Sequence, residues 1–572
     1  MALTKAHNRM IEGVPVNVLD FGADRTGTST SHAEIQDAID HASANGKAVY
    51  IPSGDYKMAG IITVPSFMTI YGSGPQSRLF RDTSVDMFDF MRIKSTSDIQ
   101  LKDFKIDGVT KEDNASYTSN YSGVRVCQTI PEVTVAEALQ TDFTYTFPSP
   151  ASTSDFAVYR NQVLQTLTTD YTVNLATSTV TLNAATGAGA IIIIANLGGT
   201  EAQPHNILLE GLHIEKTTGG EQQAAANTAG IVLEDCYDVT VSKCRLEDNR
   251  SAGILISQVS SYGIRSLPPF QTNKIRISDC VGYGEVFPFD NSWPSGFGSF
   301  ITGNQFEEMQ VSGCYADGFG YTNIGLNGQK QSVTGCISLN SSYAGITLGH
   351  PSEGSRPAEV VCSNNICLNN NYAGITSVGA TNLLISGNAL ANNCVTDSAA
   401  AEIEVRYDSN YVAGTSDKIT ISDNVIRDGN AVGIQCEVGN SIFITGNQIH
   451  DCGNRALFLT QKNATDVMEV FVANNYLKDS GTSTQSAIEV SATTGAANAL
   501  CMNNYIFTSD VSTKQGMGIT AVGSLADVQV HDNWFSTGYV GTLNTNFGAR
   551  NTKAFNAFSS GTLTLSTRLL TP

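Results

Sequence analysis

A short hydrophobic pattern recurs along the chain from about Phe104 onward. It reads apolar, any residue, turn-type residue, rung residue, any residue, apolar, where the rung residue is the buried position at a bend. Neighbouring copies are 22 residues apart between Cys314 and Cys336 and 23 apart between Asn424 and Asn447. A period of about 22 with alternating apolar residues predicts coils of three short strands, stacked as a right-handed parallel β-helix. The 3.6-residue periodicity of a helical solenoid is absent. The predicted rung residues are Phe104, Leu212, Cys244, Cys280, Cys314, Cys336, Asn364, Asn388, Asn424, Asn447, Asn474, Asn503 and Asn533.

The chemistry of the rung residues fits such stacked coils. Successive coils lie about 4.8 Å apart, so an inward Asn can hydrogen-bond the Asn residues above and below it. A Cys at the same position fills the space as a small hydrophobic residue. We therefore expect most of the cysteines to be structural rather than catalytic or metal-binding.

A second strand pattern, often Ala-Gly-Ile, follows each rung residue by about ten positions. The Ile is expected to point into the core, which leaves the residues on either side pointing outward. Aligning the copies gives two outward columns. The position after the Ile holds Val232, Leu255, Gly325, Thr347, Thr376, Glu404 and Gln435, and two residues later stand Glu234, Ser257, Asn327, Gly349, Val378, Arg406 and Glu437.

The opening of the chain has a different pattern. Val-Asn-Val-Leu-Asp-Phe-Gly-Ala at 16–23 precedes an amphipathic helix predicted over 31–44, with Ile35, Ala38, Ile39 and Ala42 on one face. Gly-Lys-Ala-Val-Tyr-Ile-Pro follows at 46–52. Over roughly the first eighty residues this resembles the start of the pectate-lyase-like β-helix superfamily, as found in phage tailspikes. The resemblance implies a helix that caps the open end of the coils and, at 1–15, a leader that attaches to a phage particle.

The pattern divides the chain into further segments. The β-helix is expected to start within 16–127 and to continue over 204–536. Between them, residues 128–203 show alternation and Gly/Ala turns that predict an inserted small β-sandwich. This module either binds carbohydrate or a partner, or is an insertion without a role of its own. Residues 537–572 lose the pattern and are expected to form a C-terminal cap or a trimer contact.

Composition excludes several classes of function. The net charge of −20 disfavours nucleic-acid binding, because phosphates would be repelled. The 12 cysteines show no paired CxxC spacing, and no phosphate loop or Ser-His-Asp signature is present, so we expect no metal and no cofactor. The longest apolar stretch, 188–197, is too short to span a membrane, and the first residues lack the apolar region of a signal peptide.

The densest group of ionisable residues in the outward columns is the catalytic candidate. Glu404 and Glu437 lie on neighbouring strands, with backbones predicted about 8 Å apart. Glycosidic hydrolysis needs one carboxylic acid and one carboxylate, and this spacing favours an inverting enzyme. Arg406 would keep one carboxylate ionised, and His350 lies in a nearby loop. A surface ladder of ion pairs is the competing interpretation.

The candidates for substrate binding surround this group or lie in a separate aromatic loop. The first set is Glu402, Tyr407, Asp408, Gln435, Glu353 and Arg356, and the second is Asp290 and Trp293. Aromatic rings with polar neighbours suit stacking on sugars, although such a loop can also pack on itself. A lyase would instead use Arg406, His350 or Tyr407 to neutralise a uronate and abstract its proton.

The resemblance and the candidate site together predict a phage tailspike that binds and depolymerises a bacterial surface polysaccharide: capsule, exopolysaccharide or O-antigen. Hydrolysis is preferred, with a lyase and a non-catalytic receptor-binding spike as alternatives. The resemblance also implies a homotrimer, attachment to a phage tail or baseplate adaptor through the N-terminus, and a place in the virion tail.

Overall fold

The computed structural model of the chain contains two compact units, residues 1–276 and 277–572. The structure describes residues 14–84, 89–108, 122–127, 132–135, 140–144, 156–160, 163–185, 191–196, 203–217, 229–249, 252–257, 272–284, 298–349, 357–396, 400–407, 417–437, 439–462, 467–481, 485–509, 517–535, 553–554 and 557–558.

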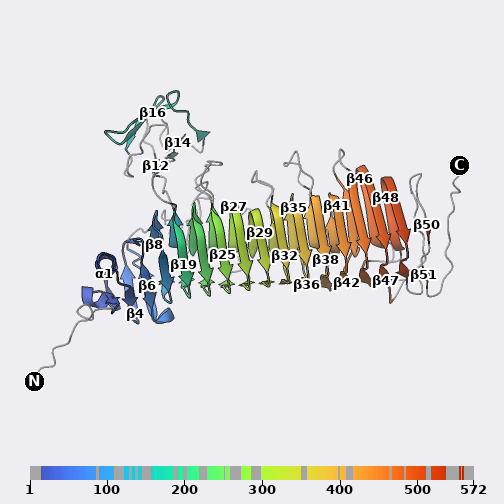
Figure 1. Cartoon of the computed structure of the whole chain (residues 1–572), viewed down its shortest axis with the longest axis horizontal. Coiled ribbons are helices and arrows are strands. Elements are labelled where there is room, and N and C mark those ends of the chain that lie inside the picture. Colours follow the sequence, from blue (N-terminus) through green and yellow to red (C-terminus); the bar gives the residue numbers. More distant parts are fainter. Residues whose placement is uncertain are drawn as a thin grey trace, which may run out of the picture. The chain divides into compact units, whose positions relative to one another are not determined.

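The first unit is built from β-helix coils with three parallel strands per turn (Figure 1). One sheet contains β1 (Val16–Asn17), β3 (Val49–Ile51), β6 (Thr69–Gly72), β9 (Ile99–Lys102), β19 (His205–Glu210) and β22 (Tyr237–Ser242). A second contains β5 (Ile62–Thr63), β8 (Asp89–Lys94), β11 (Ser122–Cys127), β21 (Ile231–Glu234) and β24 (Ala252–Ser257). A third contains β2 (Thr26–Thr30), β4 (Gly54–Met58), β7 (Ser77–Arg81), β10 (Lys105–Asp107), β20 (His213–Glu215) and β23 (Arg245–Glu247). The strand β25 (Asn273–Ser278) spans the division between the units.

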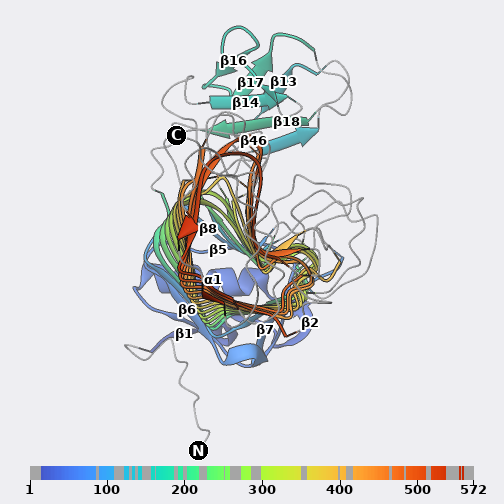
Figure 2. The same cartoon turned by 90° about the vertical axis from the view of Figure 1, so that its right-hand side faces the viewer.

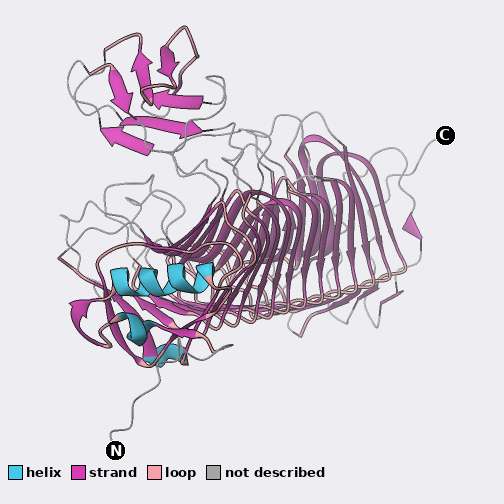
Figure 3. Ribbon diagram, turned by 60° about the vertical axis from the view of Figure 1, so that its left-hand side comes forward, coloured by secondary structure: helices cyan, strands magenta, loops and turns pink. Residues whose placement is uncertain are grey.

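The predicted capping helix is present as α1 (His32–Ala44), and it packs against the first strands of the coils (Figure 3). Its buried residues are the four that the sequence placed on one face: Ile35, Ala38, Ile39 and Ala42. They cover the core at the point where a solenoid would otherwise expose its interior. Two short 3₁₀ helices, η2 (Val18–Phe21) and η3 (Gly74–Gln76), complete the helical structure of the described residues.

The predicted β-sandwich is also present in the first unit. Two antiparallel sheets form it, with a shared core that includes Phe143, Val158, Tyr171, Val180 and Ile192. One sheet holds β12 (Glu132–Val135), β14 (Phe156–Arg160), β15 (Val163–Leu164) and β18 (Ile191–Asn196), and the other holds β13 (Asp142–Thr144), β16 (Tyr171–Asn174) and β17 (Thr179–Leu182).

The second unit repeats the three-strand coil, and the view of Figure 2 shows the outline of the turns. Its first sheet contains β32 (Ala358–Ser363), β35 (Thr381–Ser386), β38 (Asp417–Ser422), β41 (Asn440–Thr445), β44 (Val467–Ala473) and β50 (Lys553–Ala554). Its second contains β31 (Ile346–Leu348), β34 (Ile375–Val378), β37 (Ala401–Arg406), β40 (Val432–Cys436) and β43 (Leu457–Gln461). Four long strands belong to both the first and the second sheet of this unit: β27 (Ser299–Ser312), β29 (Ile324–Thr334), β46 (Ser486–Met502) and β48 (Met517–His531). The third contains β26 (Val281–Tyr283), β28 (Tyr315–Asp317), β30 (Ile337–Leu339), β33 (Ile366–Leu368), β36 (Ala389–Ala391), β39 (Val425–Arg427), β42 (Gln448–His450), β45 (Tyr476–Lys478), β47 (Tyr505–Phe507), β49 (Trp534–Phe535) and β51 (Ala557–Phe558).

An asparagine ladder runs through the second unit, but three predicted rung positions were wrong by one residue. The buried rung residues are Asn365, Asn475 and Asn504, whereas Asn364, Asn474 and Asn503 precede them with φ of 57°, 58° and 53°. In each Asn-Asn pair the first residue makes the left-handed bend that Asn tolerates, and the second turns inward. At each step the backbone N–H and the Nδ2 of one Asn both donate to the Oδ1 of the next.

The cysteines have the structural role that was predicted for most of them. All twelve are buried and none is in a disulfide. Burial raises the pKa of Cys127, Cys436 and Cys501 to about 12, so these thiols do not ionise near neutral pH.

Residues 1–13 of the predicted leader at 1–15 lie outside the described residues, as does most of 537–572. Within the latter, β50 and β51 pair in parallel with β48 and β49. Among the helices that the structure describes, none combines the length and the apolar character needed to cross a membrane.

Candidate functional site

The strands β37 and β40 bring four of the predicted residues together on the outer face of the second unit. Glu404 stands directly opposite Gln435 in the parallel register, as Thr376 does opposite Glu404. The alignment of these positions that was predicted from the Ala-Gly-Ile pattern is therefore confirmed at these coils. Arg406 and Glu437 follow two residues later, Arg406 as the last residue of β37 and Glu437 directly after the end of β40.

Glu404 is a nearly buried carboxyl group with few partners. Only 3% of the residue is exposed, and its Oε2 has no hydrogen-bond partner among the described residues. Burial raises the pKa of Glu404 to about 7, against the opposing effects of the Tyr372 hydroxyl and the Arg406 guanidinium. The nearest cationic atom, Nε of Arg406, is 3.9 Å from Oε1. Glu404 is therefore protonated for much of the time near neutral pH.

Glu437, directly after β40 in the next coil, has a contrasting environment. Its Oε1 accepts hydrogen bonds from the ammonium of Lys462 and, at 3.0 Å, from Nε2 of Gln435. Its Oε2 accepts the backbone N–H of Tyr407 at 3.1 Å. Three donors thus hold this carboxylate in one orientation. Gln435 and Tyr407 were predicted to bind substrate, and here they donate hydrogen bonds to the catalytic candidate Glu437. Lys462 was not among the predicted site residues.

A stack of tyrosine rings, absent from the prediction, lies beside Glu404. Tyr321 and Tyr343 have ring centroids 5.1 Å apart, and Tyr343 and Tyr372 have centroids 4.6 Å apart, in both cases with nearly parallel rings. Tyr372 interacts with Glu404, while Nη1 of Arg406 donates to the Tyr343 hydroxyl at 3.4 Å. The signal was visible in the sequence, because Tyr343 and Tyr372 precede two identical Ala-Gly-Ile-Thr segments.

Glu402 does not lie on the outer face, which contradicts its predicted contact with substrate. The residue has 0% exposure, and both carboxylate oxygens accept hydrogen bonds from Asn393. The expectation assumed strict alternation along the strand. Instead the Glu402 side chain turns inward at the start of β37, where it accepts hydrogen bonds from the buried Asn393.

Several predicted residues lie outside the part of the chain that the structure describes. They are His350, Glu353, Arg356, Asp408, Asp290 and Trp293. Their roles remain predictions.

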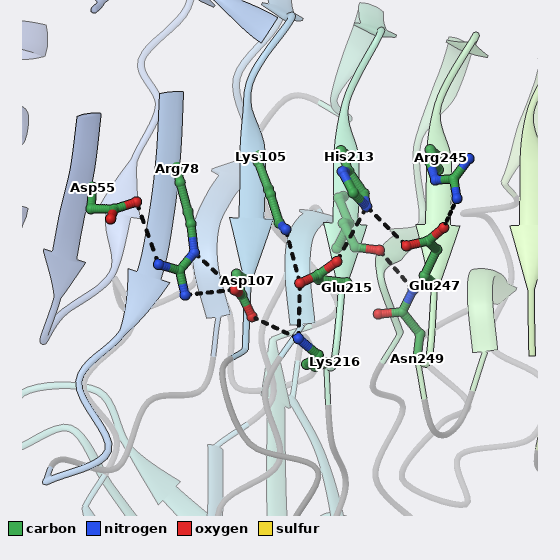
Figure 4. Close-up of polar contacts among 11 residues, drawn as sticks. Asp55, Arg78, Lys105, Asp107, His213, Glu215, Lys216, Arg245, Glu247 and Asn249 are labelled. Atoms are coloured by element: carbon green, nitrogen blue, oxygen red, sulfur yellow. Dashed lines mark hydrogen bonds and ion pairs between the residues drawn. The ribbon is translucent and has the colours of Figure 1, made fainter. Parts of the chain in front are cut away.

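A second group of charged residues lies on the third sheet of the first unit (Figure 4). His213, Glu215 and Glu247 have ligand atoms within 4.8 Å of one another, a spacing that could hold a metal ion. However, the ammonium groups of Lys105 and Lys216 lie 2.9 and 3.0 Å from Oε1 of Glu215. Despite burial, they lower the pKa of Glu215 to about 2. These cations already neutralise the carboxylate, so the group is explained as a network of ion pairs.

The comparison with known families concerns the first coils. Residues 15–126 match the family model described as rhamnogalacturonase A/epimerase, pectate lyase-like. The chain carries a pectate-lyase-like region. This match confirms the resemblance to the pectate-lyase-like superfamily that was found in the sequence pattern of the first eighty residues. The pectate-lyase-like region ends before the sandwich and does not include Glu404 or Glu437.

Two curated relatives also match part of the chain. The mannuronan C5-epimerases AlgE5 and AlgE2 of Azotobacter vinelandii are each 34% identical to it over 114 residues. The match covers 18% of this chain and only 11% of either epimerase.

Solved structures that match the chain include an epimerase module and two tailspike proteins. The AlgE6 A-module of Azotobacter vinelandii has a TM-score of 0.45 and 16% identity, covering 80% of this chain and 98% of that chain. The Dettilon tailspike protein has a TM-score of 0.49 and 14% identity, covering 78% and 68%. The tailspike of E. coli bacteriophage HK620, in complex with a pentasaccharide, has a TM-score of 0.43 and 10% identity, covering 95% and 78%. The assignment of the fold depends on the strand register described above.

Proposed function

We propose that the chain depolymerises a polysaccharide by hydrolysis, with Glu404 as the general acid and Glu437 as the base. The observation that carries the proposal is the difference between two carboxyl groups on neighbouring strands. Glu404 is buried with a raised pKa of about 7, whereas Glu437 accepts hydrogen bonds from three donors. Pairs of titratable groups in contrasting environments are the arrangement from which acid and base roles are assigned.

The chemistry follows from these environments. A protonated Glu404 can give its proton to the oxygen of the leaving sugar, which avoids the release of an unstable alkoxide. Glu437, held by Lys462 and Gln435, can accept a proton from the attacking water. Arg406 favours loss of the proton from Glu404, but this effect is smaller than that of burial, which favours retention of the proton.

The test is cleavage of bacterial surface polysaccharides, measured as the release of reducing ends from a panel of capsules, exopolysaccharides and O-antigens. E404Q and E437Q keep the shape of each side chain but remove its acid–base function. Each should lower kcat by about 10²–10⁴-fold, with little change in KM.

E489Q is the matched control for these substitutions. Glu489 stands in the same outward column two coils after Gln435, and its carboxylate also pairs with an arginine, Arg455, at 2.6 Å. It should retain activity. If the wild-type protein binds a glycan but releases no product, or if E404Q and E437Q cleave as fast as E489Q, the proposed hydrolysis is wrong.

A lyase is the second candidate, and Arg406 is the observation that favours it. Its side chain is 40% exposed, and among the described residues its Nη2 has no hydrogen-bond partner, so the guanidinium can approach a ligand carboxylate. Such a contact would stabilise the charge that develops on a uronate when its C5 proton is removed. A lyase product carries a double bond that absorbs in the ultraviolet, whereas a hydrolase product does not.

The proposed biological setting is a phage tail. The support comes from the pectate-lyase-like opening and from the outward position of the candidate site. In this setting the protein would be a homotrimeric tailspike that recognises a bacterial surface polysaccharide, with its N-terminus bound to a tail or baseplate adaptor. A receptor-binding spike without catalysis predicts instead that E404Q and E437Q adsorb to the host normally and that wild-type protein yields no product.

A further inference from the structure

A second ladder of polar residues runs inside the second unit, at the bend before the strands that carry the candidate site. The backbone N–H of Ser341 donates to Oδ1 of Asn370 at 3.0 Å. The N–H and Nδ2 of Asn370 then donate to Oδ1 of Asn393, at 3.0 and 2.7 Å. One coil later the same position, directly after the left-handed residue Asp428, is Gly429, which has no side chain to continue the ladder.

Glu402 continues the ladder at that point. Its Oε1 accepts the N–H of Asn393 at 3.0 Å and its Oε2 accepts Nδ2 of Asn393 at 2.5 Å. The carboxylate occupies the space of the missing side chain, because a Cβ added to Gly429 would lie 2.9 Å from both Cγ and Oε1 of Glu402. Glu402 therefore accepts the two hydrogen bonds that an Asn at 429 would otherwise accept.

The choice of residues at this coil is unusual for the chain. In register with Glu402 stand Gly374 on one side and Gly433 on the other. The preceding coil combines Gly374 at the strand start with Asn370 in the ladder, and the following coil has glycine at both positions. The coil of Glu402 has Asn393 in the ladder and a glutamate at the strand start. Burying a carboxylate is costly compared with burying an Asn amide. A ladder alone does not require it.

We propose that Glu402 is a positioning residue that ties the start of β37 to the second ladder and thereby fixes Glu404 and Arg406 on the outer face. A side chain on the strand itself anchors the strand, whereas an Asn at 429 would belong to the following coil and leave β37 without this tie. Because Glu404 is two residues from Glu402, a shift of the strand start moves the acid. This inference rests on the proposed function for its catalytic consequence.

The experiment separates the anchoring of β37 from the continuity of the ladder, by moving the acceptor of the Asn393 hydrogen bonds from Glu402 to position 429 in the following coil. E402A removes the link to β37 and the ladder acceptor together, and it should lower the melting temperature and kcat. In the double variant E402A/G429N, the new Asn can accept the bonds of Asn393, because the Glu402 side chain no longer occupies the space and Gly429 has no left-handed backbone that would disfavour a side chain. The remaining neighbour of the new Cβ is Sγ of Cys452 at 3.2 Å, which must shift by a few tenths of an ångström. We expect the double variant to recover the melting temperature while kcat stays about 10–100-fold below wild type, with KM little changed. E402Q keeps the tie through one oxygen and should retain most of the activity.

Hydrogen exchange of the same unliganded proteins gives a readout that does not need the proposed reaction. The amides of β37 should exchange faster in E402A/G429N than in the wild type, with other strands unchanged. Recovery of both kcat and β37 protection in the double variant would overturn the proposal and leave Glu402 as a ladder residue only. If wild type cleaves no glycan, the proposed function fails, and the exchange rates alone decide whether Glu402 ties the strand.

Discussion

At the scale of single residues, two glutamates two positions apart on β37 have different surroundings and similar titration. Burial raises the pKa of both Glu402 and Glu404 to about 7, yet Glu402 faces Asn393 inside the coil and Glu404 faces the outer surface. We propose the catalytic role for Glu404 alone, because Glu402 is enclosed by the coil and accepts the hydrogen bonds of Asn393. The pKa therefore does not distinguish the ladder residue from the proposed acid, whereas the positions of the two side chains do.

The pKa of Glu404 predicts the pH dependence of cleavage. The general acid must be protonated, so kcat/KM should fall above about pH 7, approaching tenfold per pH unit as Glu404 ionises. A pH–rate profile on the cleaved glycan measures this limb. A rate that stays constant from pH 6 to pH 9 would contradict the role of Glu404 as the acid.

The same shift has a consequence for stability. The folded pKa of Glu404 lies above its ordinary 4.5, so the folded protein binds the proton more tightly than the unfolded chain. This favours the folded state at low pH, and the advantage is lost as pH rises from about 4.5 through 7. E404Q cannot ionise, and its melting temperature relative to wild type should therefore increase over this window, by an amount corresponding to about 1–3 kcal/mol. A difference that is the same at pH 4.5 and pH 8 would be inconsistent with the raised pKa.

At the scale of the elements, the bends decide which residue of an Asn pair is structural. Asn365 is buried, and its Oδ1 accepts the backbone N–H of Cys336 at 2.9 Å, whereas Asn364 is exposed in a left-handed conformation with φ of 57°. Sequence spacing alone could not distinguish them, because either residue gives a period close to 23 with Asn388.

The pair offers a matched test of the ladder. N365A leaves the backbone N–H of Cys336 without its acceptor, removes the donor to the Val333 carbonyl and creates a cavity, so we expect a loss of about 2–4 kcal/mol in the free energy of unfolding. N364G should have little effect, because glycine adopts the left-handed bend without strain. Chemical denaturation of the two variants measures both. Equal losses of unfolding free energy in N365A and N364G would contradict the assignment of Asn365, rather than Asn364, to the ladder.

At the scale of the whole molecule, the spacing of the repeat predicted most of the fold, and the aligned columns predicted part of the candidate site. The spacing of residues such as Asn424 and Asn447 predicted the coils, and the Ala-Gly-Ile alignment placed Glu404 opposite Gln435 correctly. It failed at Glu402, because the alignment assumed strict alternation along the strand, whereas this side chain turns inward and accepts the hydrogen bonds of Asn393. The tyrosine stack was missed because ring-to-ring contacts join side chains of successive coils that lie before the aligned strands.

Assembly is the remaining prediction at this scale. The proposed tailspike is a homotrimer, so light scattering coupled to size-exclusion chromatography should give about three times the 60.7 kDa of one chain. Each chain carries a net charge of −20, and like-charged subunits repel one another most strongly when little salt screens them. The trimer should therefore be complete at physiological ionic strength and should dissociate first, if at all, in low salt. A mass of one chain at every ionic strength would contradict the trimer while leaving the candidate site intact, because Glu404, Glu437 and Arg406 all belong to a single chain.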